Sequence, residues 1–435
     1  MNERSRGARE PMPRSWVPDG DADFPLANLP YGAIVRAGDP IPHLAVAIGD
    51  FALDLHALAR AGIFDDALLD ARALLCGPTL DALLACGRPT WSAVRAAIGA
   101  YLHVDDGVGN ARVRDGELAA RALVPRGAFR NVRPFTVATY VDFFASLEHA
   151  TNLGRILRPG EEPLAPNWRH LPVGYHGRAS TLSWDDTVRR PRGIVAGLDG
   201  GPIFVPTRKL DYELELACVT GDAPAALDPD RARASIFGFM LLNDWSARDI
   251  QAFEYRPLGP FLGKSFATSL SPWIVPFDAL ESYRCAAPEQ SPQPLAHLRE
   301  TGDGAYDIDL EVAIASAAMR ARGDAEHVVA RTNARGLYWT MGQQLAHVTS
   351  NGTRVRAGDV YATGTISGVA SEASGSLIER TWDGARPLAL SDGTTRTYLE
   401  DGDHVVMRAV ASRDGRARIG FGALRTTVAR ATAES

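Results

Sequence analysis

The sequence predicts a mainly β fold with some helix, of the α+β class, and two observations predict it. First, apolar and polar residues alternate at residues 212–218 and 308–314, and strand-like patterns recur at 404–410 and 417–424. Second, helical patterns are few and do not alternate with strands, which argues against a chain of βαβ units. A chain of 435 residues, 46% of them hydrophobic, is long enough to bury a large core.

Three segments are expected along the chain. Residues 1–20 are rich in Arg, Pro and Ser without an apolar stretch, and we expect a mobile tail there, not a secretory signal. Residues 21–130 are expected to form a first domain, because residues 125–127 (PRG) and 132–134 (VRP) are typical of a boundary near 130. Residues 131–435 then form a second, strand-rich domain.

The first domain is predicted to contain a hairpin and two helices. Residues 45–48 and 51–53 are short apolar runs on either side of Gly49-Asp50, a turn signal, which predicts the hairpin. Residues 57–73 and 79–100 are rich in Ala and Leu, which predicts the helices.

The second domain is predicted to contain a fully buried strand at residues 235–242, a continuous apolar run. A helix is expected to follow it, because Ser246 and Asp249 have the spacing of a capping box. Residues 337–347 predict another helix, which Asn351-Gly352 would end.

Charge, cysteine content and hydropathy argue against several classes of protein. A net charge of −6 leaves no basic excess for a nucleic-acid backbone. The four cysteines include no C-x-x-C pair, which argues against a thiolate metal site or a disulfide framework. No stretch reaches the roughly 18 apolar residues of a membrane span, so we expect a soluble, cytoplasmic protein.

Two glutamates at residues 213 and 215 are the first candidate for chemistry. In Tyr212-Glu213-Leu214-Glu215-Leu216 the side chains of Glu213 and Glu215 share one face of a strand. Adjacent carboxylates repel each other unless a cation lies between them, and their oxygens suit Mg²⁺, Ca²⁺ or Mn²⁺. An ordinary solvated strand face is the alternative, and the pair alone favours it.

A polar stripe follows the buried strand. Asp244 ends that strand, and Arg248, Gln251 and Tyr255 then recur at helical spacing, so they share one helix face. The stripe combines a cation, an amide and a phenol, which suits substrate binding. A solvent-facing amphipathic helix explains the pattern equally well.

Other candidates are single residues. Lys264 lies in a G-K-S triplet, but Leu258 occupies the position of the first P-loop glycine, so Lys264 is interpreted as one positioned cation. Thr365 lies in residues 364–368 (GTISG), where glycines allow a backbone to approach an anion, although a plain turn is the alternative. His149 has Asp142 seven residues before it and Arg158 nine after, which is suggestive without being specific.

Several longer motifs carry a family resemblance. They are residues 142–143 (DF), 148–152 (EHATN), 166–168 (PNW), 171–180 (LPVGYHGRAS), 243–251 (NDWSARDIQ), 257–266 (PLGPFLGKSF) and 364–368 (GTISG), with 23–25 (DFP), 28–32 (NLPYG) and 418–422 (RIGFG) near the ends. Together they resemble the fumarylacetoacetase family, also called the fumarylacetoacetate hydrolase family. The resemblance covers nearly the whole chain past the tail, and so many long motifs are highly specific.

The resemblance implies a fold, an activity and an assembly. The fold would be a small N-terminal SH3-like β-barrel followed by a large mixed β-roll catalytic domain, assembled as a homodimer. The activity would be hydrolysis of 4-fumarylacetoacetate to fumarate and acetoacetate, the last step of tyrosine and phenylalanine breakdown. The cofactor would be Mg²⁺ or Ca²⁺, with no organic cofactor.

The resemblance also implies residue roles. The metal would be held by Asp142, Glu213, Glu215 and Asp244, with a further magnesium role at Lys264 and Thr268. Because an ammonium has no lone pair, Lys264 is better suited to donate to a substrate oxygen. Substrate contacts would come from Arg158, Tyr175, Gln251, Tyr255 and Thr365, and Glu379 would orient the catalytic His149.

The chemistry of the reaction suits those roles. His149 would deprotonate the attacking water, with Glu379 holding its other ring nitrogen. Arg248, Gln251 and Lys264 would face the oxyanion, and the metal would hold the diketone oxygens.

One position departs from the family pattern. Phe144 stands where the family often has a tyrosine whose hydroxyl would contact the substrate carboxylate. A related acylpyruvate or acylacetoacetate is therefore the alternative substrate. A noncatalytic metal-bound binding protein is a further alternative, which the joint presence of His149, Glu379 and Lys264 argues against.

Overall fold

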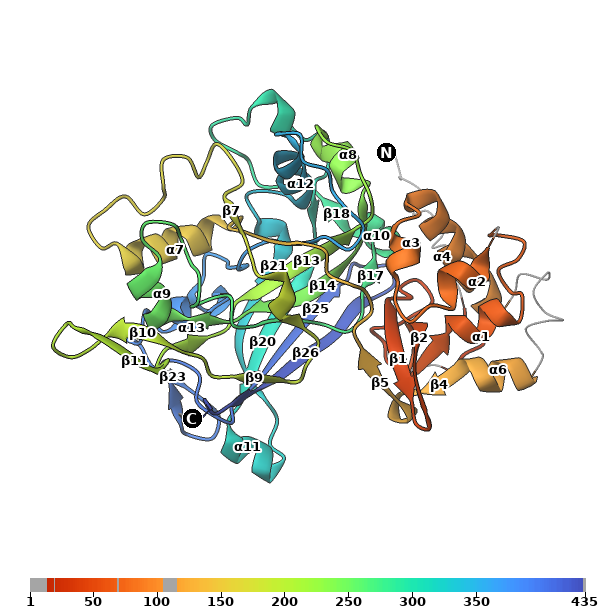
Figure 1. Cartoon of the computed structure of the whole chain (residues 1–435), viewed down its shortest axis with the longest axis horizontal. Helices are drawn as coiled ribbons and strands as arrows, with labels where there is room; N and C mark the ends of the chain where they lie inside the picture. Colours follow the sequence, from red (N-terminus) through yellow and green to blue (C-terminus); the bar gives the residue numbers. More distant parts are fainter. Residues whose placement is uncertain (1–13, 19, 69, 105–115, 433–435) are drawn as a thin grey trace, which may run out of the picture.

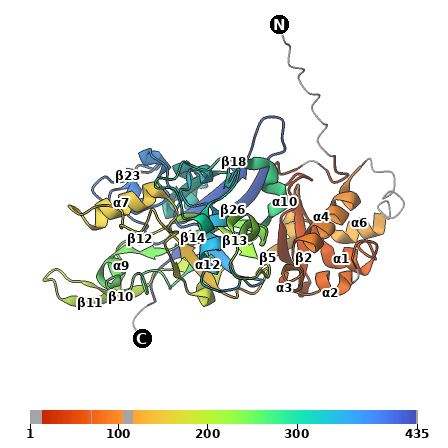
Figure 2. The same cartoon turned by 90° about the horizontal axis from the view of Figure 1, so that it is seen from above.

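The computed structural model describes residues 14–18, 20–68, 70–104 and 116–432. The predicted mobile tail falls mostly on residues 1–13, which lie outside the described residues. Two residues of the segment, Trp16 and Val17, pack on the N-terminal part: Trp16 Nε1 donates to the Tyr101 carbonyl at 2.9 Å, and Val17 is buried. The N-terminal part lies beside a larger second part in both views (Figure 1, Figure 2).

An antiparallel five-stranded sheet forms the centre of the N-terminal part, in the order β4-β3-β2-β1-β5. Its strands are β1 (Tyr31–Arg36), β2 (Asp39–Ile48), β3 (Phe51–Asp54), β4 (Leu123–Pro125) and β5 (Phe129–Val132). The predicted hairpin is confirmed, since Ile48 pairs with Phe51 across a turn in which Gly49 has a φ of 51°.

The two long helices predicted for this part are wrong in extent. The chain forms shorter helices instead: α1 (Leu55–Arg60), α2 (Ala71–Leu75), α3 (Asp81–Leu84), α4 (Arg88–Leu102) and α6 (Gly116–Ala122). Gly62 follows the end of α1 with a φ of 78°, and Gly87, with a φ of 79°, is the N-cap residue of α4. Asp70 begins α2 by accepting from the Ala73 amide at 3.0 Å. The Ala- and Leu-rich composition favoured one helix in each predicted segment, but these glycines and the Asp70 cap divide the segments into shorter helices.

Two sheets form the larger part. The eight-stranded mixed sheet has the order β7-β6-β22-β13-β14-β16-β8, with β17 beside β14, and the five-stranded sheet has the order β21-β20-β25-β26-β9. The first comprises β6 (Tyr140–Phe143), β7 (Gly174–His176), β8 (Leu182–Ser183), β13 (Leu214–Thr220), β14 (Ile236–Asp244), β16 (Thr268–Leu270), β17 (Val275–Pro276) and β22 (Val360–Ala362). The second comprises β9 (Thr187–Arg189), β20 (Asp309–Ala315), β21 (His327–Asn333), β25 (His404–Ala411) and β26 (Ile419–Ala429).

Helices and short strands surround these sheets. The helices are α7 (Leu147–Leu157), α8 (Pro229–Arg233), α9 (Arg248–Glu254), α10 (Phe277–Leu280), α11 (Ala317–Arg322), α12 (Met341–Thr349) and α13 (Leu377–Arg380). The short strands are β10 (Arg192–Ala196), β11 (Pro202–Pro206), β12 (Leu210–Asp211), β15 (Ser246–Ala247), β18 (Arg284–Cys285), β19 (Ala305–Tyr306), β23 (Leu388–Ala389) and β24 (Thr395–Arg396). The predicted mainly β, α+β class is confirmed: a small antiparallel sheet domain precedes a large mixed β domain.

Strand β13 is buried on both faces, so the solvated strand face that the Glu213–Glu215 pair alone favoured is wrong. Leu214, Leu216 and Cys218 face the core of the larger part, whereas Ala217 and Val219 face a second core that includes the N-terminal part. The N-terminal part thus covers the face that alternation alone would leave to water. The predicted buried strand at 235–242 is confirmed as β14.

The starts of two helices differ from the sequence predictions. Helix α12 begins later than predicted, at a capping box of Thr340 and Gln343. The capping box expected before α9 is wrong, since its N-cap residue is Ala247 and, among the described contacts, no side chain caps the helix. Asp249 instead accepts from the Arg208 amide at 2.9 Å, and Ser246 donates to the Asp244 carbonyl at 3.1 Å.

Helices α7 and α9 lie at the end of the larger part farthest from the N-terminal part (Figure 1, Figure 2). Among the helices of the described residues, none has both the length and the apolarity that crossing a lipid bilayer requires.

Candidate active site

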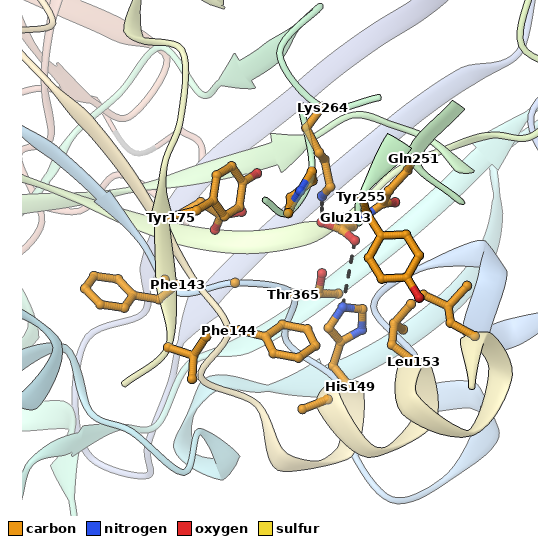
Figure 3. A pocket seen from close by; sticks show the side chains of 18 of the residues that line it. Phe143, Phe144, His149, Leu153, Tyr175, Glu213, Gln251, Tyr255, Lys264 and Thr365 are labelled. Carbon is orange, nitrogen blue, oxygen red and sulfur yellow. Dashed lines mark hydrogen bonds and ion pairs between the residues drawn. The ribbon is translucent and has the colours of Figure 1, made fainter. Parts of the chain in front are cut away.

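The predicted site residues meet around a cavity of about 390 Å³ between α7, α9 and the ends of β6 and β13 (Figure 3). Those that line it are Asp142, Phe144, His149, Arg158, Tyr175, Glu213, Glu215, Arg248, Gln251, Tyr255, Lys264 and Thr365. Asp244 and Thr268 line a neighbouring cavity of about 230 Å³, which shares Tyr175 and Lys264 with the first. Residues scattered over more than 200 positions of the sequence thus form one site.

His149 lies in the first turn of α7 and forms a pair with Glu379. Ser146 caps this helix by accepting from the His149 amide at 3.3 Å. Nδ1 of His149 lies 2.6 Å from Oε2 of Glu379, and both residues are buried. The structure therefore brings together the predicted base and its predicted orienting carboxylate, 230 residues apart.

Glu379 is held as a carboxylate by several donors. Asn152 donates to its Oε1 at 3.1 Å, and Ser367 and Ser376 donate to its Oε2 at 2.9 and 2.7 Å. Burial raises the pKa of Glu379, but His149 and the hydrogen bonds from Ser376 and Asn152 outweigh burial and lower the pKa below the ordinary value. Because an ionised carboxylate only accepts, Nδ1 of His149 carries the proton and Nε2 faces Glu213 Oε1 at 3.8 Å.

Three buried acids form a cluster opposite the histidine. Oxygens of Asp142 on β6, Glu215 on β13 and Asp244 at the end of β14 all lie within 4.8 Å of one another. Among the described residues, no hydrogen-bond partner reaches Oδ1 of Asp142 or Oε1 of Glu215, although both atoms are buried. Buried oxygens without donors are ligands that a hard divalent cation would satisfy, so the donor set fits Mg²⁺ or Ca²⁺.

Lys264 partly neutralises this cluster. Its Nζ donates to Asp244 Oδ2 at 2.6 Å and to Glu213 Oε2. Burial lowers the pKa of Lys264, but Asp244 and Glu213 outweigh it and raise the pKa above the ordinary value, so the ammonium stays charged. Burial raises the pKa of Glu213, yet Lys264, Arg248 and His149 lower it to about 2.

The structure therefore places only some of the predicted metal ligands in the acid cluster. Asp142, Glu215 and Asp244 form the cluster, whereas Glu213 lies beside it, between Lys264 and Arg248, whose Nη2 is 2.8 Å from Glu213 Oε1. Thr268 Oγ1 donates to Asp244 Oδ1 at 3.2 Å and so positions that carboxylate. The ligand roles of Glu213, Lys264 and Thr268 stay predictions.

Cation binding to the cluster is expected to depend on pH. Burial and then mutual repulsion raise the pKa of Asp142 and Glu215 well above ordinary values. The metal-free folded protein therefore binds more protons at these carboxyls than the unfolded chain, so they make its unfolding free energy fall as pH rises above about 4. Mg²⁺ competes with those protons, so a fixed Mg²⁺ concentration should raise Tm more at about pH 8 than at about pH 5. Thermal unfolding at both pH values checks this, and an equal or smaller increase at the higher pH would contradict it.

The polar stripe of α9 faces the cavity, as its spacing predicted. Arg248 Nη1 donates to Gln251 Oε1 at 3.2 Å, and Arg248 is buried. Tyr255 lies above His149 in the close-up view (Figure 3) and accepts from Arg256 Nε at 2.9 Å. From the opposite wall, Tyr175 donates to Asp244 Oδ2 at 3.2 Å. The solvent-facing alternative for this helix face is therefore wrong.

Arg158, Thr365 and Phe144 complete the wall. Arg158 is the C-cap residue of α7 and donates to the Pro163 carbonyl at 3.0 Å. The buried hydroxyl of Thr365 has no hydrogen-bond partner within the part of the chain that the structure describes, so it is free for a ligand. Phe144 presents its ring to His149 edge-on, with centroids 5.3 Å apart.

The backbone at position 364, immediately before Thr365, requires glycine. Its φ is 75°, and a Cβ there would lie 2.2 Å from the Phe143 carbonyl oxygen. Its amide donates to Glu215 Oε2 at 3.0 Å, so the close approach that glycine allows holds one of the clustered acids.

Sequence reasoning missed several supporting residues. Asn152 follows His149 by three positions, a helical spacing that could have revealed it, because both contact Glu379. Ser367 and Ser376 had no comparable signal. Asp211 was missed too, although it immediately precedes the Tyr212 segment and contacts Arg248 at 2.9 Å.

The fold and the site together define a metal-binding enzyme, in which a mixed β domain holds buried acids beside a histidine–carboxylate pair. The family model for the fumarylacetoacetate hydrolase C-terminal domain matches residues 138–429, and that for the fumarylacetoacetase N-terminal domain matches residues 27–134. The chain belongs to the fumarylacetoacetate hydrolase family, which confirms the resemblance of its motifs.

Proteins similar to this chain include fumarylacetoacetases from two kingdoms. The one from Oryza sativa subsp. japonica is 45% identical over 96% of this chain and 97% of its own length. The one from Homo sapiens is 42% identical over 94% of this chain and 97% of its own length. A solved structure of a fumarylacetoacetate hydrolase from Exiguobacterium antarcticum matches with a TM-score of 0.49 at 16% identity, covering 92% of this chain and 99% of that one.

Proposed function

We propose that the chain hydrolyses a carbon–carbon bond of 4-fumarylacetoacetate, giving fumarate and acetoacetate, with Mg²⁺ or Ca²⁺ as cofactor. The relatives named fumarylacetoacetase support this, since they cover nearly the whole chain. The observation that carries the proposal is the buried His149–Glu379 pair, whose histidine lines one cavity together with Asp142 and Glu215 of the acid cluster.

His149 is the general base in this proposal. Glu379 fixes the proton on Nδ1, so the lone pair of Nε2 faces the cavity and takes a proton from water as it attacks the fumaroyl carbonyl. The bond between that carbon and the adjacent methylene then breaks, and its electron pair leaves with the acetoacetate fragment. The proton held by His149 is transferred to the methylene carbon of that fragment, so the hydroxyl of water ends on fumarate and its proton on acetoacetate.

Cations around the cavity stabilise the negative charge that develops. Lys264 has three N–H donors, and Glu213 and Asp244 occupy two, which leaves one for a substrate oxygen. Arg248 and Gln251 line the same cavity. Held by Asp142, Glu215 and Asp244, a divalent cation would supply Lewis-acid polarisation of the diketone oxygens.

Purified protein tests the proposal directly. With 4-fumarylacetoacetate and Mg²⁺ or Ca²⁺, the ultraviolet absorption of the diketone should disappear at a rate proportional to protein concentration. Absence of turnover in folded protein that binds the metal would exclude this function.

Phe144 motivates the second candidate, hydrolysis of a related acylpyruvate or acylacetoacetate. Its ring lines the cavity beside His149 without a hydroxyl for a distal carboxylate. Comparison of kcat/KM across diketo acids with and without that carboxylate separates the two candidates.

Phe144→Tyr is expected to raise kcat/KM for 4-fumarylacetoacetate about tenfold, since a hydrogen bond to a charged group contributes about 1.5–3 kcal/mol. An acylpyruvate that lacks the distal carboxylate is the matched control, and its kcat/KM should change little. Equal gains on both substrates would show that the hydroxyl does not recognise the carboxylate.

The chain is further proposed to act as a homodimer in the cytoplasm. Exposed apolar side chains on the β10–β11 hairpin, such as Ile194 and Phe204, support a second copy as partner, as do Leu258, Phe261 and Leu262 after α9. The cysteines of the described chain are all free thiols, which suits a reducing compartment. Light scattering after size-exclusion chromatography tests the dimer.

A further inference from the structure

We propose that Asp211 is a positioning residue that links Arg248 to the helix carrying Glu379. The link deepens the proposed function and rests on it, because both partners of Asp211 serve the same reaction. Asp211 ends the short strand β12 and is fully buried. It is outside the acid cluster and does not line the cavity.

The carboxylate of Asp211 accepts three hydrogen bonds from two different elements and also forms an ion pair with Nη2 of Arg248. Its Oδ2 lies 2.9 Å from Nε and 2.8 Å from Nη2 of Arg248. Its Oδ1 accepts from the Leu377 amide at 2.7 Å, and its Oδ2 from the Ile378 amide at 3.0 Å. Arg248 begins α9, and Leu377 and Ile378 begin α13, so Asp211 joins the two helices at their first residues.

The first amides of a helix have no acceptor within that helix, so a partner from elsewhere must satisfy them. Ser376 occupies the N-cap position of α13, but in the described structure its side chain does not cap the helix. Its hydroxyl donates instead to Glu379 at 2.7 Å. Asp211, on strand β12, therefore caps helix α13. This leaves the Ser376 hydroxyl free to hold the Glu379 carboxylate, which orients His149.

The backbone around Asp211 is fixed on both sides. Asp211 pairs with Ser246 in the ladder between β12 and β15, and the Arg248 amide donates to the Lys209 carbonyl at 2.9 Å. The Leu399 amide donates to the Leu210 carbonyl at 2.9 Å. A carboxylate on so rigid a segment sets the position of the guanidinium and of α13 together.

The arrangement has a kinetic consequence. Asp211 occupies Nε and one side of Nη2, which turns Nη1 of Arg248 toward Gln251 at 3.2 Å. Arg248 is proposed to face the oxyanion, and Glu379 to hold the imidazole that moves the proton. Both actions are needed in the transition state, so loss of Asp211 should lower kcat far more than it changes KM.

Asp211→Asn tests the proposal, with Asp403→Asn as the matched control. Asp403 is also fully buried, and it accepts from Arg396 Nε and Nη2 and from the Glu400 amide, each at 2.8 Å, outside the cavity. With Mg²⁺ present, Asp211→Asn should lower kcat about 10²-fold with KM within about threefold, since small misplacements of catalytic groups cost that much. Asp403→Asn should lower Tm while keeping kcat within about twofold of the wild type.

A second measurement does not depend on turnover. The proton on Nδ1 of His149 reports its bond to Glu379 by NMR at fixed pH, and Asp211→Asn should shift or broaden that signal whereas Asp403→Asn should not. If wild-type protein does not turn over the diketo acid, the proposed function fails and the NMR arm alone decides the role of Asp211.

The results that overturn the proposal are equally definite. The proposal is overturned if folded Asp211→Asn keeps the wild-type kcat or changes only KM. It is also overturned if the NMR signal of the His149 Nδ1 proton is unchanged in this variant. If Asp211→Asn does not fold, Asp211→Glu carries the same tests, because it keeps the charge but displaces the carboxylate by one methylene. Failure of both variants to fold would assign Asp211 a purely structural role.

Discussion

Replacement of His149 by alanine is expected to lower kcat on 4-fumarylacetoacetate by about 10³-fold, since a positioned general base contributes about 10²–10⁴-fold. Nε2 of His149 is the imidazole atom that faces the cavity, and Glu379 holds its other ring nitrogen at 2.6 Å. Metal affinity should persist, because the acid cluster lies on β6, β13 and β14 and not on α7. Steady-state kinetics and calorimetry with Mg²⁺ measure both quantities.

The matched control is His170→Ala, which removes an exposed histidine that does not line the cavity. Its kcat should stay within about twofold of the wild type, as is usual for surface substitutions away from a site. Activity of His149→Ala within about tenfold of the wild type would remove His149 as the base.

Replacement of Glu215 by glutamine is expected to weaken Mg²⁺ binding but to stabilise the metal-free protein. Glu215 is fully buried in the acid cluster, and its Oε2 accepts from the Gly364 amide at 3.0 Å. Loss of one charged ligand should weaken Mg²⁺ binding about 100-fold and abolish measurable turnover, since ligand charge sets affinity for hard cations. The metal-free variant should be more stable than metal-free wild type at about pH 8, because burial and Asp142 and Asp244 raise the pKa of Glu215.

That gain in stability should vanish as pH falls toward about 4, where the carboxyl is protonated in the unfolded chain as well. Glu300→Gln is the matched control, because Glu300 is a mostly buried glutamate that contacts Arg233 and accepts from Thr340 at 2.6 Å, away from the cavity. It should leave Mg²⁺ affinity unchanged. Wild-type Mg²⁺ affinity in Glu215→Gln would exclude the cluster as the metal site.

The fold was predictable where a local pattern and its environment agree. Strand β14 is a continuous apolar run and is buried on both faces. The helices of the N-terminal part were not, because Ala and Leu favour helix over residues 57–73 while Gly62 and the Asp70 cap divide it. Burial of β13 on both faces depends on packing against the N-terminal part, which no pattern within the strand reveals.

The sequence predicted which residues form the site better than it predicted which of them contact one another. Helical spacing placed Arg248, Gln251 and Tyr255 on one face, and all three line the cavity. Alternation placed Glu213 and Glu215 on one face, but their partners come from elsewhere: Lys264 is 51 residues from Glu213. These two carboxylates therefore differ in pKa although their sequence contexts are nearly identical. Charges brought together by folding cause that difference.

Hydrolysis of 4-fumarylacetoacetate in water enriched in ¹⁸O tests the central claim most directly. If His149 activates water for attack on the fumaroyl carbonyl, wild-type protein with Mg²⁺ should form fumarate and acetoacetate in equal amounts, with one ¹⁸O in the new carboxylate of fumarate. No product, or fumarate without ¹⁸O, would contradict the claim.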